Sequence, residues 1–247
     1  MKKLSLVLAS VLGAVLAYAQ EDHPPHWSYE SATGPTHWGD LSPDYSLCKT
    51  GQEQSPINIA NTVAEKLPPI DFHYLPSQLK LVDNGHTVQV NYAPGSSITV
   101  AGKKYELLQF HLHHPSEETI NGKPYDLGIH LVHKDAEGHL AVVAVLFKGG
   151  ASNAAIKAVV DHLPTVKEQE ITADATVDAA DLLPQTRNYY TFSGSLTTPP
   201  CTEGVMWFVL QTPSTLSSAE VGTLARLYPH NARPLQPLNA RRVKAGN

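Results

Sequence analysis

The chain has 247 residues, of which 42% are hydrophobic and 17% charged, with a formal net charge of -5. This length and composition suffice for one large domain with a sizeable hydrophobic core. The mildly acidic balance provides no basic surface for a nucleic-acid partner, which argues against a nucleic-acid-binding protein.

Residues 1–19 have the pattern of a secretory signal peptide. A lysine pair precedes an apolar run over residues 4–16, and Ala17-Tyr18-Ala19 has the small-x-small pattern of a cleavage site. An uncleaved membrane anchor is the alternative, but the apolar run is short for a membrane span. We therefore expect cleavage after Ala19, a mature domain over 20–247 without a membrane anchor, and a periplasmic or secreted location.

Cysteine usage agrees with export. Cys48 and Cys201 are the only cysteines, and an even pair in an exported chain suggests one disulfide. Closing so long a loop would stabilise the fold by about 5 kcal/mol in the chain-entropy model. The alternative is two buried free thiols.

The mature chain begins with an irregular segment up to residue 60, in which prolines and glycines break any periodicity. Its aromatic residues, among them Trp27 and Trp38, are too many for a disordered arm, so we expect this segment to pack onto the domain.

Beyond this segment, bulky runs separated by turn residues predict strands. The expected strands cover 79–82, 87–92, 97–100, 107–113, 127–133, 140–147, 189–192 and 205–210. Two short helices are expected, one capped by Ser152 and ending near Leu163, the other over 219–228. This pattern predicts a single α+β domain dominated by a sheet.

Three histidines stand out within these strands. His111 and His113 alternate along one strand, so their rings point to the same face about 7 Å apart, and a neighbouring strand can direct His130 to the same point. Three neutral imidazoles with a fourth position left open are typical of a catalytic zinc site. The alternative is a row of ordinary histidines. The residues just before them are apolar, which indicates a buried strand, and unpartnered imidazoles are costly to bury.

Eight ordered motifs carry a resemblance to a known family. They are Trp27-Ser28-Tyr29, Gln54-Ser55-Pro56-Ile57-Asn58-Ile59, Asn84-Gly85-His86, Gln109-Phe110-His111-Leu112-His113, Ser116-Glu117, His130-Leu131-Val132-His133, Ser195-Leu196-Thr197-Thr198-Pro199-Pro200 and Asn231-Ala232-Arg233-Pro234. In these motifs the chain resembles an α-class carbonic anhydrase of the secreted bacterial type, from about Trp27 to Arg242. The resemblance implies a central twisted, mostly antiparallel sheet of about ten strands, with Zn2+ in a conical cleft.

The resemblance also implies an activity, the zinc-dependent reversible hydration of carbon dioxide to bicarbonate and a proton. Zinc held by the three histidines would lower the pKa of its water to about 7. Thr197 would accept a hydrogen bond from the resulting hydroxide while donating one to Glu117. The alternative for Thr197 is an ordinary turn threonine.

Further residues take roles by the same resemblance. The substrate side of the cleft would consist of Val132, Val142, Leu196, Thr197, Thr198 and Trp207. Taken alone, the apolar members of this set are more simply read as core. His86 matches the proton shuttle, for which an imidazole is suited, although an exposed turn histidine without a role is the alternative.

Polar residues would support these groups. Tyr29, Asn84 and Gln89 match positions that order water between the zinc and the shuttle. Gln109 shares a strand face with His111 and can bond its outer ring nitrogen, while the resemblance assigns the backbone carbonyl of Asn231 to His113.

A non-catalytic binding module of the same fold is the second hypothesis, and a purely structural zinc is disfavoured because only three protein ligands are present. Sulfonamides and small anions are expected inhibitors by the resemblance. The sequence leaves the oligomeric state open, with a homodimer as one option.

One position departs from the family pattern. The family usually has a glutamate two residues before the third zinc histidine, where its carboxylate accepts the free ring N–H, and this chain has Gly128. We expect that N–H to bond water, a backbone carbonyl or Asp126, and zinc to leave faster than from a Gly128→Glu variant. The alternative is that water or another side chain substitutes and little changes.

Overall fold

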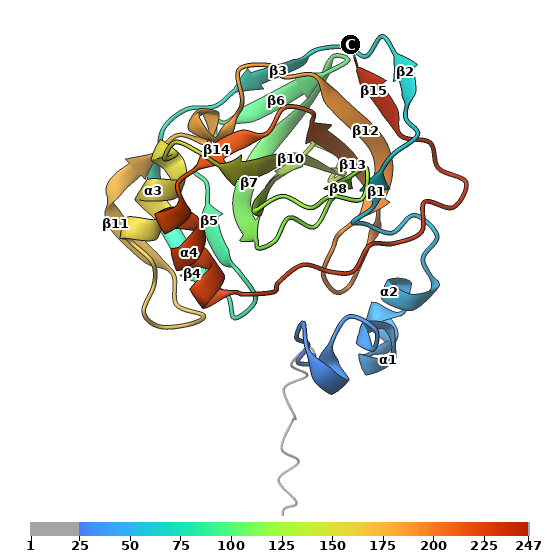
Figure 1. Cartoon of the computed structure of the whole chain (residues 1–247), viewed down its shortest axis with the longest axis horizontal. Coiled ribbons are helices and arrows are strands. Elements are labelled where there is room, and N and C mark those ends of the chain that lie inside the picture. The colour runs from blue at the N-terminus through green and yellow to red at the C-terminus, as the bar shows by residue number, and fades with distance from the viewer. Residues whose placement is uncertain (1–24, 247) are drawn as a thin grey trace, which may run out of the picture.

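The computed structural model describes residues 25–246, so the expected signal peptide lies outside the described residues. Figure 1 shows a large curved sheet with short helices at its periphery. The strands are β1 (Asn58–Ile59), β2 (Val63–Glu65), β3 (Ile70–His73), β4 (Ser77–Asp83), β5 (Val88–Asn91), β6 (Ser97–Val100), β7 (Lys103–His113), β8 (Thr119–Ile120), β9 (Leu127–Lys134), β10 (Leu140–Gly149), β11 (Ile171–Val177), β12 (Tyr189–Ser195), β13 (Glu203–Leu210), β14 (Ser214–Leu216) and β15 (Lys244–Gly246). The helices are α1 (Trp38–Leu41), α2 (Leu47–Thr50), α3 (Ala154–Asp161) and α4 (Ser218–Leu227), with 3-10 turns η1 (Ser31–Thr33), η2 (Pro43–Tyr45) and η3 (Ala179–Leu182).

The main sheet has 13 strands in the order β11-β4-β5-β7-β9-β10-β13-β12-β15-β2, with β3, β6 and β14 off this path. Its pairings are antiparallel except β10 with β13, β10 with β14, and β15 with β2. The expected sheet-dominated α+β class is confirmed. The sheet exceeds the expected ten strands because short edge strands join it, and these are too brief to show an alternating pattern.

The two long helices follow the expected positions with one correction. The cap of α3 is Asn153 rather than Ser152, because the Asn153 side chain accepts from the N–H groups of Ala155 and Ile156. The Ser152 hydroxyl instead donates to Glu220 at 2.6 Å. Glu220 belongs to a capping box that starts α4, so the two helix starts are linked.

Strands β7 and β9 lie near the middle of the sheet, where both faces are covered. One face packs against α3 and α4 in a core that includes Phe110, Ile129 and Val143. The opposite face carries a second cluster around Val142 and Trp207. Because every residue of β9 except its last is buried, side chains on this strand are held rigidly.

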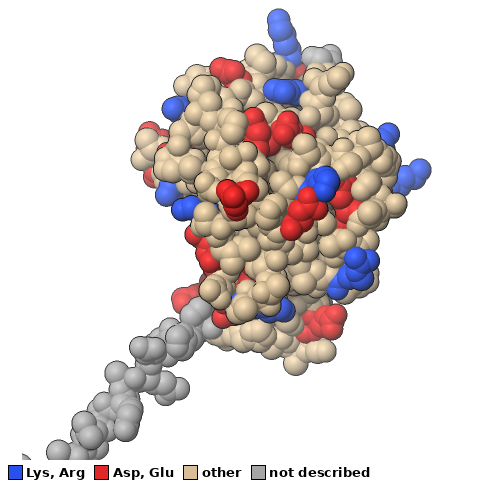
Figure 2. Space-filling model, turned by 90° about the vertical axis from the view of Figure 1, so that its left-hand side faces the viewer, with Lys and Arg blue, Asp and Glu red and all other residues tan. Residues whose placement is uncertain are grey.

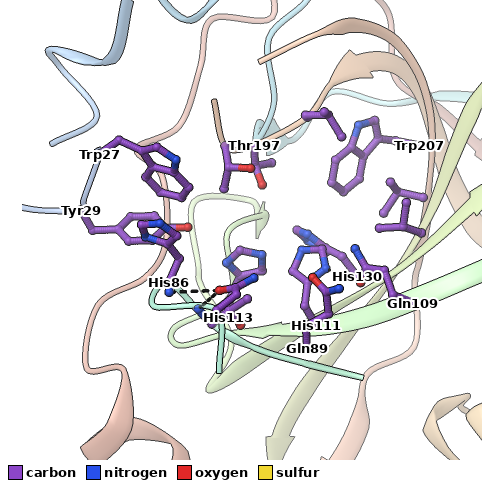
Figure 3. A pocket seen from close by; sticks show the side chains of 16 residues that line it. Trp27, Tyr29, His86, Gln89, Gln109, His111, His113, His130, Thr197 and Trp207 are labelled. Atoms are coloured by element: carbon purple, nitrogen blue, oxygen red, sulfur yellow. Dashed lines mark hydrogen bonds between the residues drawn. The ribbon is translucent and has the colours of Figure 1, made fainter. Parts of the chain in front are cut away.

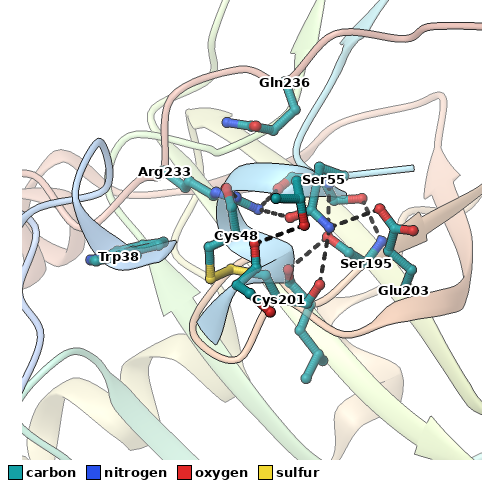
Figure 4. The surroundings of a disulfide bond; sticks show 12 residues. Trp38, Cys48, Ser55, Ser195, Cys201, Glu203, Arg233 and Gln236 are labelled. Atoms are coloured by element: carbon teal, nitrogen blue, oxygen red, sulfur yellow. Dashed lines mark hydrogen bonds between the residues drawn. A yellow bond between two sulfur atoms is a disulfide. The ribbon is translucent and has the colours of Figure 1, made fainter. Parts of the chain in front are cut away.

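The N-terminal segment packs onto the domain, as expected, and a disulfide joins it there (Figure 4). Cys48 of α2 is bonded to Cys201, 153 residues further along the chain, beside the fully buried Trp38. The expected disulfide is therefore confirmed. A search of the described residues finds no helix both long and apolar enough for a membrane span.

The face of the molecule that carries α3, α4 and β11 is seen in Figure 2, where acidic and basic side chains are interspersed among uncharged ones.

Candidate metal centre

Three imidazoles converge at the middle of the sheet (Figure 3). His111 on β7 and His130 on β9 are direct partners in the antiparallel register, and His113 lies two residues further along β7, opposite Gly128. The ring centroids are 4.6 to 5.4 Å apart, and one nitrogen from each ring lies within 4.8 Å of the other two. Strand alternation and register thus produce the convergence that the His-x-His pattern predicts.

The other nitrogen of each ring is already partnered. His111 Nδ1 lies 2.8 Å from Gln109 Oε1, and His113 Nδ1 lies 2.7 Å from the carbonyl oxygen of Asn231. Both partners are the expected ones. On His130, the Nε2 atom is engaged, 3.1 Å from a carboxylate oxygen of Glu118.

These outer contacts leave Nε2 of His111, Nε2 of His113 and Nδ1 of His130 directed at one point. The Nε2 atom of His113 is buried and finds no hydrogen-bond partner within residues 25–246. A buried nitrogen without a partner is costly, and a metal ion at this point would satisfy it. The donor set, three imidazoles with their outer nitrogens fixed, therefore fits zinc.

The protonation of the first two rings suits metal binding. Burial, with the neighbouring His130, lowers the pKa of His111 to about 3, and the same causes hold the pKa of His113 well below its usual value. Both rings are therefore neutral at pH 7, the form in which an imidazole binds a metal. Burial also acts on His130, but the carboxylates of Glu118 and Glu117 outweigh it and raise that pKa.

Glu118 replaces the partner that we expected for His130. The expected partner of the His130 ring N–H was water, a backbone carbonyl or Asp126. This expectation is wrong, because His130 Nε2 contacts the Glu118 carboxylate, and the Asp126 carboxylate instead accepts the N–H of Gly149 at 2.7 Å. The structure favours the alternative that another side chain substitutes for the glutamate missing at Gly128.

Beside the histidines lies the buried carboxyl group of Glu117, one oxygen of which accepts a backbone hydrogen bond. Its Oε1 accepts the backbone N–H of Arg233 at 2.7 Å, and its Oε2 lies 3.5 Å from His113 Nε2. Burial raises the pKa of Glu117 to about 7, although His130, the Thr197 side chain and the Arg233 N–H oppose this rise. The Oε2 atom of Glu117 has no hydrogen-bond partner among residues 25–246, so the hydrogen bond expected between Thr197 and Glu117 stays a prediction.

The loop that carries Thr197 is fixed at both ends. The N–H of Leu196 donates to the carbonyl of Thr202, and the N–H of Cys201 donates to the carbonyl of Thr198, at 2.9 and 2.8 Å. Since Cys201 is in the disulfide, the covalent link to the N-terminal segment also anchors this loop.

A cavity of about 240 Å³ opens above the histidines. The predicted residues that line it are Tyr29, Asn84, His86, Gln89, Gln109, His111, His113, His130, Val132, Val142, Leu196, Thr197, Thr198 and Trp207. Its apolar side is a single cross-strand row, because Val132 pairs with Val142 and Val142 pairs with Trp207. Two of the other predicted residues, Glu117 and Asn231, are buried behind the lining.

The opposite side of the cavity is polar. The Asn84 side chain accepts from the N–H groups of His86 and Thr87, which fixes the turn that presents His86. Burial, then the nearby His26, lowers the pKa of His86, so its ring is neutral at pH 7. Gln89 donates to Asn91 at 2.7 Å and lies opposite His111 in the register.

Comparisons with known proteins agree on one family. The sequence profile described as eukaryotic-type carbonic anhydrase matches residues 33–247. A carbonic anhydrase of Klebsiella pneumoniae is 46% identical over 221 residues, covering 88% of this chain and 90% of that protein. One of Nostoc sp. is 43% identical over 227 residues, covering 88% and 85%.

The chain belongs to the α carbonic anhydrase family.

The fold supports the same assignment. The α-carbonic anhydrase of Thermovibrio ammonificans, solved in complex with sulfanilamide, superposes with a TM-score of 0.87 at 43% identity, covering 89% of this chain and 99% of that one. The chain is therefore an enzyme of the carbonic anhydrase class.

Sequence reasoning missed two residues of this carbonic anhydrase site, Glu118 and Arg233. Arg233 is buried, and its guanidinium donates to Gln54, to the carbonyl of Ser55 and to the carbonyl of Cys48 (Figure 4). Burial lowers the pKa of Arg233 to about 10. The available signal was its place in the Asn-Ala-Arg-Pro motif, and for Glu118 it was a second carboxylate directly after Glu117.

Proposed function

We propose that this carbonic anhydrase hydrates carbon dioxide reversibly to bicarbonate and a proton, at a zinc ion held by His111, His113 and His130. The observation that carries the proposal is the convergence of three imidazole rings. Each ring directs one nitrogen at a common point, while its other nitrogen already has a partner. Once bound, zinc would supply a Lewis acid that makes hydroxide available from water near neutral pH.

Thr197 and Glu117 would orient the nucleophile. Glu117 must be ionised to accept a hydrogen bond from the Thr197 hydroxyl, and a cation held by the histidines favours the ionised form. The Thr197 hydroxyl oxygen would accept a hydrogen bond from the O–H of the nucleophile, and so aim an oxygen lone pair at the carbon of the substrate. The backbone N–H of Arg233 donates to the other oxygen of Glu117, Oε1, and keeps this carboxyl group in place.

The apolar row of Val132, Val142 and Trp207 would bind carbon dioxide, which is small and uncharged. Leu196 and Thr198 line the same cavity. A charged clamp is unnecessary for such a substrate, and weak apolar contact allows bicarbonate, which is charged, to leave.

His86 would carry the released proton to buffer. It lies in the lining opposite the apolar row and is neutral at pH 7, so it can accept a proton. Tyr29, Asn84 and Gln89 line the same cavity, where they would order the water that connects the zinc with His86.

Two further properties follow from the family and the disulfide. Sulfonamides and small anions would inhibit by occupying the metal's open position, as suggested by the sulfanilamide complex of the Thermovibrio ammonificans enzyme. The disulfide supports a location outside the cytoplasm. We propose a periplasmic or secreted enzyme whose signal peptide is cleaved after Ala19.

The test is a His113→Ala variant, compared with His73→Ala, which removes an exposed histidine on β3. The first should lose stoichiometric zinc and nearly all carbon dioxide hydration while keeping its circular dichroism spectrum, and the second should keep both. Full activity in a metal-poor His113→Ala protein would refute the zinc mechanism. A zinc-loaded, folded wild-type protein without hydration activity would instead favour the non-catalytic module.

A further inference from the structure

We propose that Glu118 is the residue that positions His130 as a metal ligand, and that Gly128 permits this by letting the Glu118 segment lie close to β9. The inference rests on the proposed zinc site. It assigns a role to two residues that the histidine pattern does not include.

The contact itself is buried and direct. Glu118 is 0% exposed and His130 is 1% exposed, and their Oε2 and Nε2 atoms are 3.1 Å apart. A carboxylate accepts from this nitrogen, which fixes the ring proton on Nε2. The Nδ1 lone pair is thereby left facing His111 and His113, the tautomer that a metal requires.

A structural role alone does not account for Glu118. Its other oxygen, Oε1, has no hydrogen-bond partner among the residues that the structure describes. A buried carboxylate with so few partners is costly, so packing alone would favour a neutral side chain here. A cation on the far side of the His130 ring would compensate this charge, which is what the proposed role supplies.

Gly128 sets how close the segment can approach. Residues 128 and 130 share a strand face, so the segment that covers Gly128 also covers His130. A Cβ atom added to Gly128 would lie 3.2 Å from both Cα and Cβ of Ser116, tighter than ordinary contact. A side chain at this position would therefore require Ser116 to give way by a few tenths of an ångström, which shifts the Ser116–Glu118 segment relative to β9.

Hydrogen bonds hold that segment in place. The Ser116 hydroxyl donates to the Glu118 carbonyl at 2.8 Å and accepts the N–H of Tyr125 at 2.9 Å. The N–H of Ser116 donates to the Tyr125 carbonyl at 3.0 Å. With Glu117 fixed by Arg233, the segment is anchored along its length, and the Glu118 side chain is directed at His130.

The experiment measures zinc release into excess chelator from zinc-loaded wild type, Glu118→Ala, Glu118→Gln and Gly128→Ala proteins. Glu118→Ala should release zinc about 10–100-fold faster than wild type. Glu118→Gln keeps an acceptor oxygen and should fall between them, and Gly128→Ala should also release faster. The double variant Gly128→Ala/Glu118→Ala should add little to Glu118→Ala, because both changes act through one contact.

The matched control is Glu106→Gln, which changes an exposed glutamate on β7 and should release zinc at the wild-type rate. A second readout, the thermal midpoint of the metal-free proteins, separates positioning from structure. Positioning predicts that Glu118→Gln unfolds no lower than wild type, whereas a structural role predicts a clear drop. Glu118→Gln also decides the matter if the alanine variant fails to fold.

Release from Glu118→Ala or Glu118→Gln at the wild-type rate, or a clear drop in the Glu118→Gln midpoint, would overturn the inference while leaving the zinc site intact. Failure of the wild-type protein to take up zinc would instead overturn the proposed function on which the inference rests.

Discussion

The indole of Trp27 lies flat against the imidazole of His86, with ring centroids 3.6 Å apart and planes 8° from parallel. Trp27 also packs edge-on against Trp38 and Tyr29, at 5.1 and 5.6 Å between centroids. The N-terminal segment, which the disulfide ties to the domain, thus provides a fixed platform for the His86 ring at the cavity lining.

His86→Ala should slow turnover most in weak buffer, by about 10-fold or more, because only proton export is impaired. Added imidazole should restore much of the rate. The measurement is carbon dioxide hydration in dilute and concentrated buffer, with His73→Ala as the exposed-histidine control. An unchanged rate for His86→Ala in dilute buffer would remove this residue from the mechanism.

His133, a buried histidine outside the three-histidine cluster, predicts how the stability of the fold changes with pH. Burial lowers the pKa of His133 to about 4, and its Nε2 lies 2.9 Å from the Tyr74 hydroxyl. The unfolded value is about 6.5, so the unfolded chain binds more protons between these values, and stability falls as pH falls through this window. Over this window the free energy of unfolding should fall by about 3 kcal/mol in total.

His133→Gln should therefore lose less stability than wild type on acidification. The free energy of unfolding in urea, measured on metal-free proteins at pH 7 and pH 4.5, provides the comparison. Equal losses in the two proteins would show that His133 does not titrate as its burial implies.

Val142 lies at the centre of the apolar row, between Val132 and Trp207, and is 2% exposed. Val142→Phe should fill part of the cavity and exclude the substrate, which should lower kcat/KM for carbon dioxide roughly tenfold or more. Val142→Ala should cost much less, and both variants should keep zinc. Wild-type kcat/KM in the phenylalanine variant would place the substrate elsewhere.

The disulfide should contribute to stability through the length of its loop. Because Cys48 and Cys201 are 153 residues apart, replacing both with serine should lower the free energy of unfolding by up to about 5 kcal/mol in the chain-entropy model. Equilibrium unfolding in urea measures this. Two free thiols titrated in the natively exported, denatured wild type would show instead that the bond does not form.

The convergence of the histidines could be predicted from sequence because strand geometry fixes it. Alternation places His111 and His113 on one face with Gln109, and a neighbouring antiparallel strand brings His130 opposite His111. The expected strands 97–100 and 127–133 match β6 and most of β9 for the same reason. Local periodicity decides these features.

Glu118 could not be predicted in this way, because it reaches His130 from an irregular segment rather than a long strand. Its position depends on how closely that segment approaches Gly128, a distance set by tertiary packing and not by periodicity. The cap of α3 shows the same limit. Ser152 and Asn153 are both good caps, and only the contact of Ser152 with Glu220 decides between them.

The most direct test of the central claim is a zinc titration of the metal-free protein, followed by carbon dioxide hydration on the same samples. The three-histidine site predicts a rate that rises linearly and reaches its plateau at one zinc per chain. Full activity without zinc, or no activity at one zinc per chain in a folded protein, would contradict it.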